Sequence, residues 1–146
     1  MPKEKEKTFT ETLVEFALEN PKEHQQYMSK LSAETLSVVI GRKARLIVAG
    51  KQGGEFIFKV TTYGVVKDDS PEGIRNVIWM DFGTFQDIVI RELDPKVARA
   101  RDQIQFTGDR SLYDSHEIMG IVEEWLSVKL RPIAQRMVRA MVRESQ

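Results

Sequence analysis

The hydrophobic period changes twice along this chain, at Gly41 and again at Asp81, and this double change most restricts the possible folds. Outside these two points, apolar residues recur every three or four positions, as they do on one face of a helix. Between them, short runs alternate apolar and polar side chains and are separated by turn residues, which is typical of half-buried strands. Strands framed by helical segments predict an α+β fold.

We expect a five-stranded, mostly antiparallel sheet, with strands at Lys43–Ala49, Glu55–Thr61, Gly64–Lys67, Ile74–Met80 and Gln103–Thr107. Because the connections between the first four are short, these strands are expected to form an antiparallel meander. In the fifth strand Ile104 and Phe106 face one side. Gly108 then permits a sharp exit into a helical segment.

Helix-capping signals mark where the remaining segments become helical. Thr8 is followed three residues later by Glu11, the spacing of a capping box. Starts are expected at Thr8, after Pro21, and at Ser32, Asp81 and Asp94-Pro95. In the short helix after Asp94, Val97 and Ala98 are expected to face inward.

Pro132 interrupts the helical C-terminal region. Since proline lacks a backbone N–H and its ring disfavours an unbroken helix, we expect either two helices or one that is kinked. The last helix should pack by its Met137, Val138 and Met141 face against the domain or a twin subunit. Its opposite face carries Arg136, Arg139 and Arg143, a pattern that usually means solvated surface and is also suited to anionic lipid headgroups.

Length and composition predict one domain. Residues 1–7 are expected to form a disordered tail and residues 8–146 a single domain, of which 132–146 are a C-terminal helical extension. The 22 basic and 22 acidic residues leave no net charge to attract nucleic acid. The absence of cysteine fits a reducing compartment. With no secretory signal and no run of roughly 18 apolar residues, a cytoplasmic location is expected.

The sequence predicts no enzyme, no metal and no cofactor. His24 and His116 lack a partner four residues away for a metal site. Ser115, His116 and Glu117 are consecutive, so their side chains splay apart and cannot form a catalytic relay. This group is better explained as the start of a helix.

The succession MDFGTFQDIVIRELDPKVARARDQIQFTGD resembles the sterol carrier protein type 2 (SCP-2) family. In that family a strand leads into a helix with an aromatic residue, then a short helix, a strand ending in Gly-Asp and a closing helix. The match is carried by Asp81, Phe85, Leu93, Asp94, Pro95, Ala98, Ile104, Phe106, Gly108 and Asp109. It extends roughly from Ala33 to Leu130. Arg101-Asp102 departs from the family's usual Gly-Lys, and the RESQ ending is not a peroxisomal address.

The resemblance implies a curved sheet covered on one face by helices that enclose an apolar tunnel. It also implies non-enzymatic binding or transfer of a fatty acid, an acyl chain or a sterol-like lipid. Transient contact with a membrane surface is a separate expectation, which rests on the arginine face of the last helix. The expected tunnel residues are Phe85, Val89, Phe106, Met119, Ile121 and Trp125. The alternative is an accessory or oligomerisation domain with a filled core, such as one half of a homodimer, which serves a partner without binding lipid.

Overall fold

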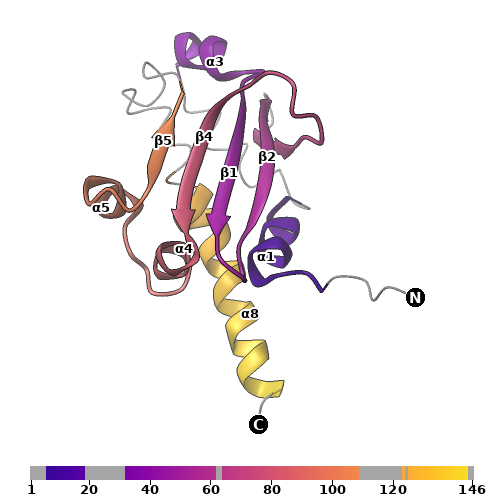
Figure 1. Cartoon of the computed structure of the whole chain (residues 1–146), viewed down its shortest axis with the longest axis vertical. Helices are drawn as coiled ribbons and strands as arrows, with labels where there is room; N and C mark the ends of the chain where they lie inside the picture. The colour runs from indigo at the N-terminus through magenta and orange to yellow at the C-terminus, as the bar shows by residue number, and fades with distance from the viewer. Residues whose placement is uncertain (1–5, 19–31, 62–63, 109–122, 124, 145–146) are drawn as a thin grey trace.

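The computed structural model describes residues 6–18, 32–61, 64–108, 123 and 125–144. Its elements, in chain order, are α1 (Phe9–Leu18), α3 (Ala33–Val39), β1 (Lys43–Ala49), β2 (Gly54–Thr61), β3 (Gly64–Lys67), β4 (Ile74–Asp81), α4 (Phe82–Val89), α5 (Pro95–Ala100), β5 (Gln105–Thr107), the π-helix η1 (Trp125–Leu130) and α8 (Arg131–Glu144). The α+β prediction is confirmed (Figure 1). All five expected strands are present, although β5 begins two residues later than expected. The helix expected after Pro21 lies outside the described residues.

The strand order is β3-β2-β1-β4-β5, so the expected antiparallel meander is confirmed for β1, β2 and β3 and is wrong for β4, which pairs with β1 instead of β3. β1 pairs antiparallel with β2 on one edge and parallel with β4 on the other, where Ile47 lies opposite Trp79. The other pairs are antiparallel, which confirms a mostly antiparallel sheet. The chain leaves β3, crosses the sheet and adds β4 beside β1. This order pairs both edges of the apolar strand β1 and leaves the two short strands at the edges.

A charged contact holds the crossing connection between β3 and β4. The Lys43 ammonium at the start of β1 lies 3.2 Å from a carboxylate oxygen of Asp68 and donates a 3.3 Å hydrogen bond to the Ser70 carbonyl. The Ser70 backbone N–H donates a 2.8 Å hydrogen bond to Asp68. That hydrogen bond first, and then Lys43, lower the pKa of the Asp68 carboxyl below its ordinary value, against the opposing effect of desolvation.

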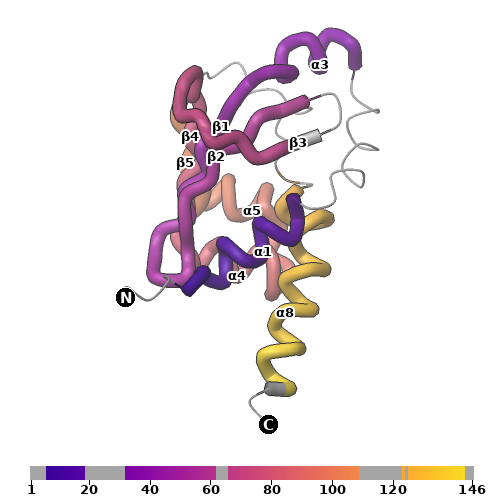
Figure 2. The backbone as a smooth tube through the Cα atoms, turned by 90° about the vertical axis from the view of Figure 1, so that its right-hand side faces the viewer, coloured from indigo at the N-terminus to yellow at the C-terminus, as the bar shows by residue number. Residues whose placement is uncertain are grey.

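The two faces of the sheet differ in character. Strand register places Leu46, Phe56, Ile78 and Phe106 in one row on the same face. Helices α1, α4 and α8 all lie on one side of the sheet (Figure 2). The residues of this row are buried or packed against the core. The prediction that helices cover one face is therefore confirmed.

Local capping explains where most of the helices begin. The Glu11 N–H donates to the Thr8 hydroxyl and the Thr8 N–H donates to the Glu11 carboxylate, each at 3.1 Å, which confirms the capping box. The other predicted caps accept backbone N–H groups as expected: Ser32 from Thr35, Asp81 from Thr84, and Asp94 from Lys96.

The chain remains helical through Pro132, which lies in the first turn of α8 directly after the π-helix η1. Proline removes one hydrogen-bond donor and its ring crowds the carbonyl four residues earlier. The wider π-helical turn relieves both effects without ending the helix. The structure thus contains one helical run with two geometries, rather than two separate helices.

One expectation about an inward-facing helical residue is wrong. Val97 is 38% exposed, because the six-residue helix α5 buries only Pro95 and Ala98. Met141 is 58% exposed, so the apolar face of α8 packs on the domain only in its first turns, as far as Met137, and packing of the rest of this face against a twin subunit stays a prediction.

Gly108 directly follows β5 and has a backbone conformation that suits the expected exit, whereas the helical segment expected after it lies outside the described residues. The φ angle of Gly108 is +123°, and an added Cβ would lie 2.2 Å from the Arg75 carbonyl oxygen and 2.6 Å from the Asn76 side chain. Only glycine fits this close approach to β4.

Candidate functional site

Most of the expected tunnel residues that the structure describes lie in one apolar layer between the sheet and the helices. Phe85 and Val89, on the inner face of α4, are completely buried, and Trp125 of η1 is 7% exposed. These three residues belong to the same core cluster, and the half-buried Phe106 packs against it from β5. Met119 and Ile121 lie outside the described residues.

Elementary packing rules explain why α4 supplies two of these residues. Asp81 ends β4 and caps α4, so the helix begins immediately at the C-terminal end of that strand. Phe85, Ile88 and Val89 then recur at intervals of three and four residues, which places them on one face. That face contacts η1 and the central strands β1 and β4.

An aromatic series connects η1 with strand β2. The rings of Trp125 and Phe58 meet edge to face, with 5.0 Å between their centroids, and Phe58 stacks on Phe56 at 6.2 Å. The tunnel prediction did not include Phe56 or Phe58. The alternation of apolar and polar residues in β2 would have identified them, because both fall on its apolar face.

Phe106 stands at the margin of the layer. The Arg99 guanidinium lies 5.6 Å from the centroid of its ring, within the range of a cation–π contact. The Phe106 ring therefore meets a charged group, while the residue also packs against the core cluster. Phe106 is better described as a boundary than as part of the interior.

Lys129 is a further residue that the sequence analysis missed. It lies in η1, one turn after Trp125, and is only 7% exposed. Among the buried residues that the structure describes, it is the one that carries a formal charge. No local pattern marks it, because a lysine within an amphipathic helix usually faces water.

Arg131 fixes the geometry between α4 and the start of α8. Its guanidinium donates two hydrogen bonds to the Ile88 carbonyl, at 3.2 and 2.9 Å, and one to the Leu93 carbonyl at 3.3 Å. Ile88 lies in the last turn of α4, where carbonyls lack a partner within the helix. The contact therefore holds α4 against the helical run that contributes Trp125.

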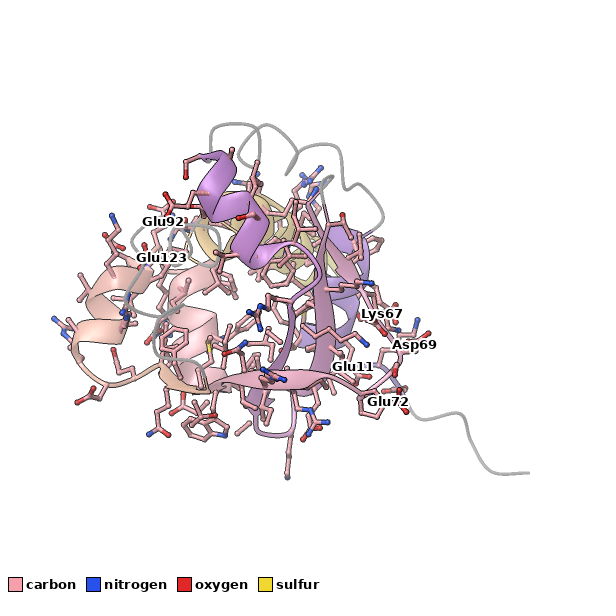
Figure 3. The ribbon with its side chains drawn as sticks, turned by 90° about the horizontal axis from the view of Figure 1, so that it is seen from above. Glu11, Lys67, Asp69, Glu72, Glu92 and Glu123 are labelled. Carbon is pink, nitrogen blue, oxygen red and sulfur yellow. The ribbon has the colours of Figure 1, made fainter. Side chains whose placement is uncertain are left out.

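The described residues contain no group of three or more histidine or acidic side chains that could hold a metal ion. Asp69 forms a 3.9 Å ion pair with Lys67, and in Figure 3 it lies on the opposite side of the molecule from Glu92. In the same part of the chain, no helix is long and apolar enough to cross a membrane. The chemistry that this region offers is apolar contact, with one buried cation.

No protein-family model and no curated protein sequence matches the chain. Solved structures share its fold. A conserved hypothetical protein from Thermus thermophilus, described as "possibly sterol carrier protein", has a TM-score of 0.50 and 15% identity, over 89% of each chain. Sterol carrier protein 2 from Yarrowia lipolytica in its apo form has a TM-score of 0.46 at 12% identity, over 87% of this chain and 98% of that one. The protein UbiJ-SCP2, named as a ubiquinone synthesis protein, has the same score and identity, over 83% and 96%. The SCP-2-like fold implied by the sequence resemblance is confirmed.

Proposed function

We propose that this chain binds a lipid or another hydrophobic small molecule, without chemistry, in the apolar layer between its sheet and its helices. The observation that carries the proposal is the convergence of Phe85 and Val89 from α4 with Trp125 from η1 in one buried cluster. The fold neighbour described as "possibly sterol carrier protein" supports the same class of ligand.

The energetics suit a long apolar chain. Burial of apolar surface contributes about 25 cal/mol per Å², or about 0.8 kcal/mol for each methylene group. A fatty acyl chain could therefore be retained by the layer alone, with no directional contact along its length. Aromatic rings such as those of Phe58 and Trp125 supply large flat surfaces for such contacts.

Lys129 favours a ligand with an anionic end over a neutral sterol. Its side chain is buried on the same helical segment as Trp125. Lys129 already has an interaction within the fold, and since an ammonium group has three N–H donors it can also pair with a carboxylate brought into this environment, where the attraction between opposite charges is strengthened away from bulk water. The proposed ligand is accordingly a fatty acid or a similar acyl anion.

Native mass spectrometry of the purified protein, followed by organic extraction, tests the proposal directly. We expect a carried lipid, and saturable binding of a fluorescent fatty acid. Affinity for the acid should exceed that for the alcohol of equal chain length, and Lys129→Met should remove this difference. Equal affinity for acid and alcohol in the unmodified protein would reject the role of Lys129 alone.

The variant Val89→Trp tests whether the ligand occupies the apolar layer. It introduces a large side chain at a completely buried position in the layer, at a cost of about 1–3 kcal/mol where the interior is already filled. Val97→Trp makes the same change at an exposed position on α5 and serves as the control. Loss of fatty acid binding only in Val89→Trp, with little change in Tm, supports the proposal. A large fall in Tm, with no lipid bound even by the unmodified protein, would favour the filled-core accessory domain instead.

A further inference from the structure

The C-terminal part of α8 extends beyond the body of the protein. In two perpendicular views the helix runs past the end of the sheet, and its last turns stand clear of the other labelled elements (Figures 1 and 2). The burial of its side chains decreases toward the C-terminus. Ala134 is completely buried and Met137 packs against the core, whereas Met141 and Val142 are 58% and 51% exposed. The apolar face thus continues beyond the surface on which it packs.

The same region carries a net positive charge, whereas the whole chain has no net charge. The 22 basic and 22 acidic residues of the protein balance, yet the segment 125–144 contains five basic residues and one acidic residue, Glu144 at its end. Three of them, Arg136, Arg139 and Arg143, are exposed. Their spacing of three and four residues places them on one face of α8, opposite the apolar face. The protruding turns are therefore amphipathic and cationic.

A second copy of the chain does not suit this surface. Two copies packed along it would bring arginine rows of the same sign together, and Glu144 at the end of α8 is the one acidic residue of that helix against four arginines. The exposed apolar surface is also small. Met141 and Val142 are the two α8 side chains that are large, apolar and mostly exposed, whereas a stable interface commonly buries about 800 Å² on each partner.

A helix with one apolar and one arginine-rich face is instead suited to the interface of a lipid bilayer. Its apolar side chains enter the boundary between headgroups and acyl chains. Long arginine stems allow the guanidinium groups to reach the headgroup phosphates. Negative surface charge on the bilayer strengthens the attraction for each nearby cation.

We propose that residues 137–143 of α8 dock the protein on a bilayer that contains anionic lipids. The contact is peripheral and reversible, and it uses Met141 and Val142 as the apolar part and Arg139 and Arg143 as the charged part. It does not depend on lipid uptake by the core, because these side chains lie outside the buried layer. It would place that layer beside the membrane in which a hydrophobic ligand resides.

Sedimentation of the full chain with vesicles tests the docking. We expect binding to phosphatidylcholine vesicles that contain phosphatidylglycerol, little binding to pure phosphatidylcholine, and weakening by salt. The double variant Arg139→Gln/Arg143→Gln should reduce affinity about tenfold or more, since each cation near an anionic surface contributes appreciably. Met141→Ser should also reduce it. Because the substituted side chains are exposed, Tm should not change.

Lys51→Gln/Lys96→Gln removes the same charge from exposed positions on other elements and should leave vesicle binding unchanged. Equal loss in this control would show that net charge alone is responsible, and would overturn the proposal. So would absence of binding to the anionic vesicles. Sedimentation equilibrium provides the remaining test: a dimer that Met141→Ser dissociates would assign the surface to a second copy.

Discussion

Replacing Arg131 with methionine should destabilise the protein more than a typical substitution at a half-buried surface position does. The guanidinium donates hydrogen bonds to two carbonyls, those of Ile88 and Leu93. The Ile88 carbonyl belongs to the C-terminal end of α4, where a positive charge is also favoured by the helix dipole. Methionine retains most of the apolar stem and removes every one of these hydrogen bonds together with the charge.

The expected magnitude follows from these contacts. A hydrogen bond to a charged group contributes about 1.5–3 kcal/mol. Two carbonyls lose such a donor, but water can reach the half-buried position and replaces part of the loss. We therefore expect Arg131→Met to reduce the free energy of unfolding by about 2–3 kcal/mol. For a chain of this length, the corresponding fall in Tm is roughly 4–12 °C.

Urea unfolding followed by tryptophan fluorescence measures the effect, since Trp125 lies in the adjoining helix. Arg136→Met is the matched control, because the Nε of Arg136 donates only a 3.4 Å hydrogen bond to the Pro132 carbonyl within its own helix. The control should lose less than about 0.5 kcal/mol. Arg131→Lys should fall between the two, because an ammonium cannot reproduce the fork that reaches both carbonyls. Equal stability of Arg131→Met and Arg136→Met would refute the reasoning.

Three further predictions concern stability. Gly108→Ala should lower the free energy of unfolding by more than about 2 kcal/mol, because the added Cβ meets the β4 backbone. Gly73→Ala has no atom within 4 Å of the added Cβ and should lose only about 1–2 kcal/mol, the cost of its positive φ angle. Similar losses in the two variants would contradict the steric explanation. Thr8→Ala should cost about 1 kcal/mol through loss of the capping box, and Thr8→Ser should restore most of it in thermal unfolding. The folded-state pKa of Asp68 is lowered, so its stabilisation is complete above the unfolded pKa of about 3.9 and is lost as the pH falls through the folded value. Asp68→Asn should therefore be less stable than the parent at neutral pH and equally stable in strong acid, and a difference independent of pH would count against the ionised carboxylate.

Features that depend on neighbouring residues could be predicted from the sequence. The capping box at Thr8 and Glu11 involves residues three positions apart, and Asp81 caps the helix that it precedes. The strands follow from alternation within single short runs. The burial of Phe85 and Val89 follows from helical spacing that is readable over one or two turns. These signals are local because the physical interactions that produce them are local.

Features set by distant segments could not be predicted in this way. Short connections favour hairpins, and nothing near Ile74 indicates that β4 pairs with β1 rather than with β3. The contact between Arg131 and the Ile88 carbonyl joins positions 43 residues apart. Helical period correctly describes an apolar face around Met141, but it does not show where the body of the protein ends. The exposure of that residue is a property of the assembled fold.

The parallel pairing of β1 with β4 also has a consequence for the order of assembly. β2 follows β1 after one tight turn, whereas β4 reaches the opposite edge of β1 only after the chain has formed β3 and crossed the sheet. Pairings close in sequence form sooner than distant ones. We therefore expect the hairpin of β1 and β2 to form before β4 docks, with an open, apolar edge that can pair with another chain. Molecules are most prone to aggregate in this interval, so substitutions that delay the docking of β4 should lower the yield of refolded protein at high concentration even where the native state is as stable as before.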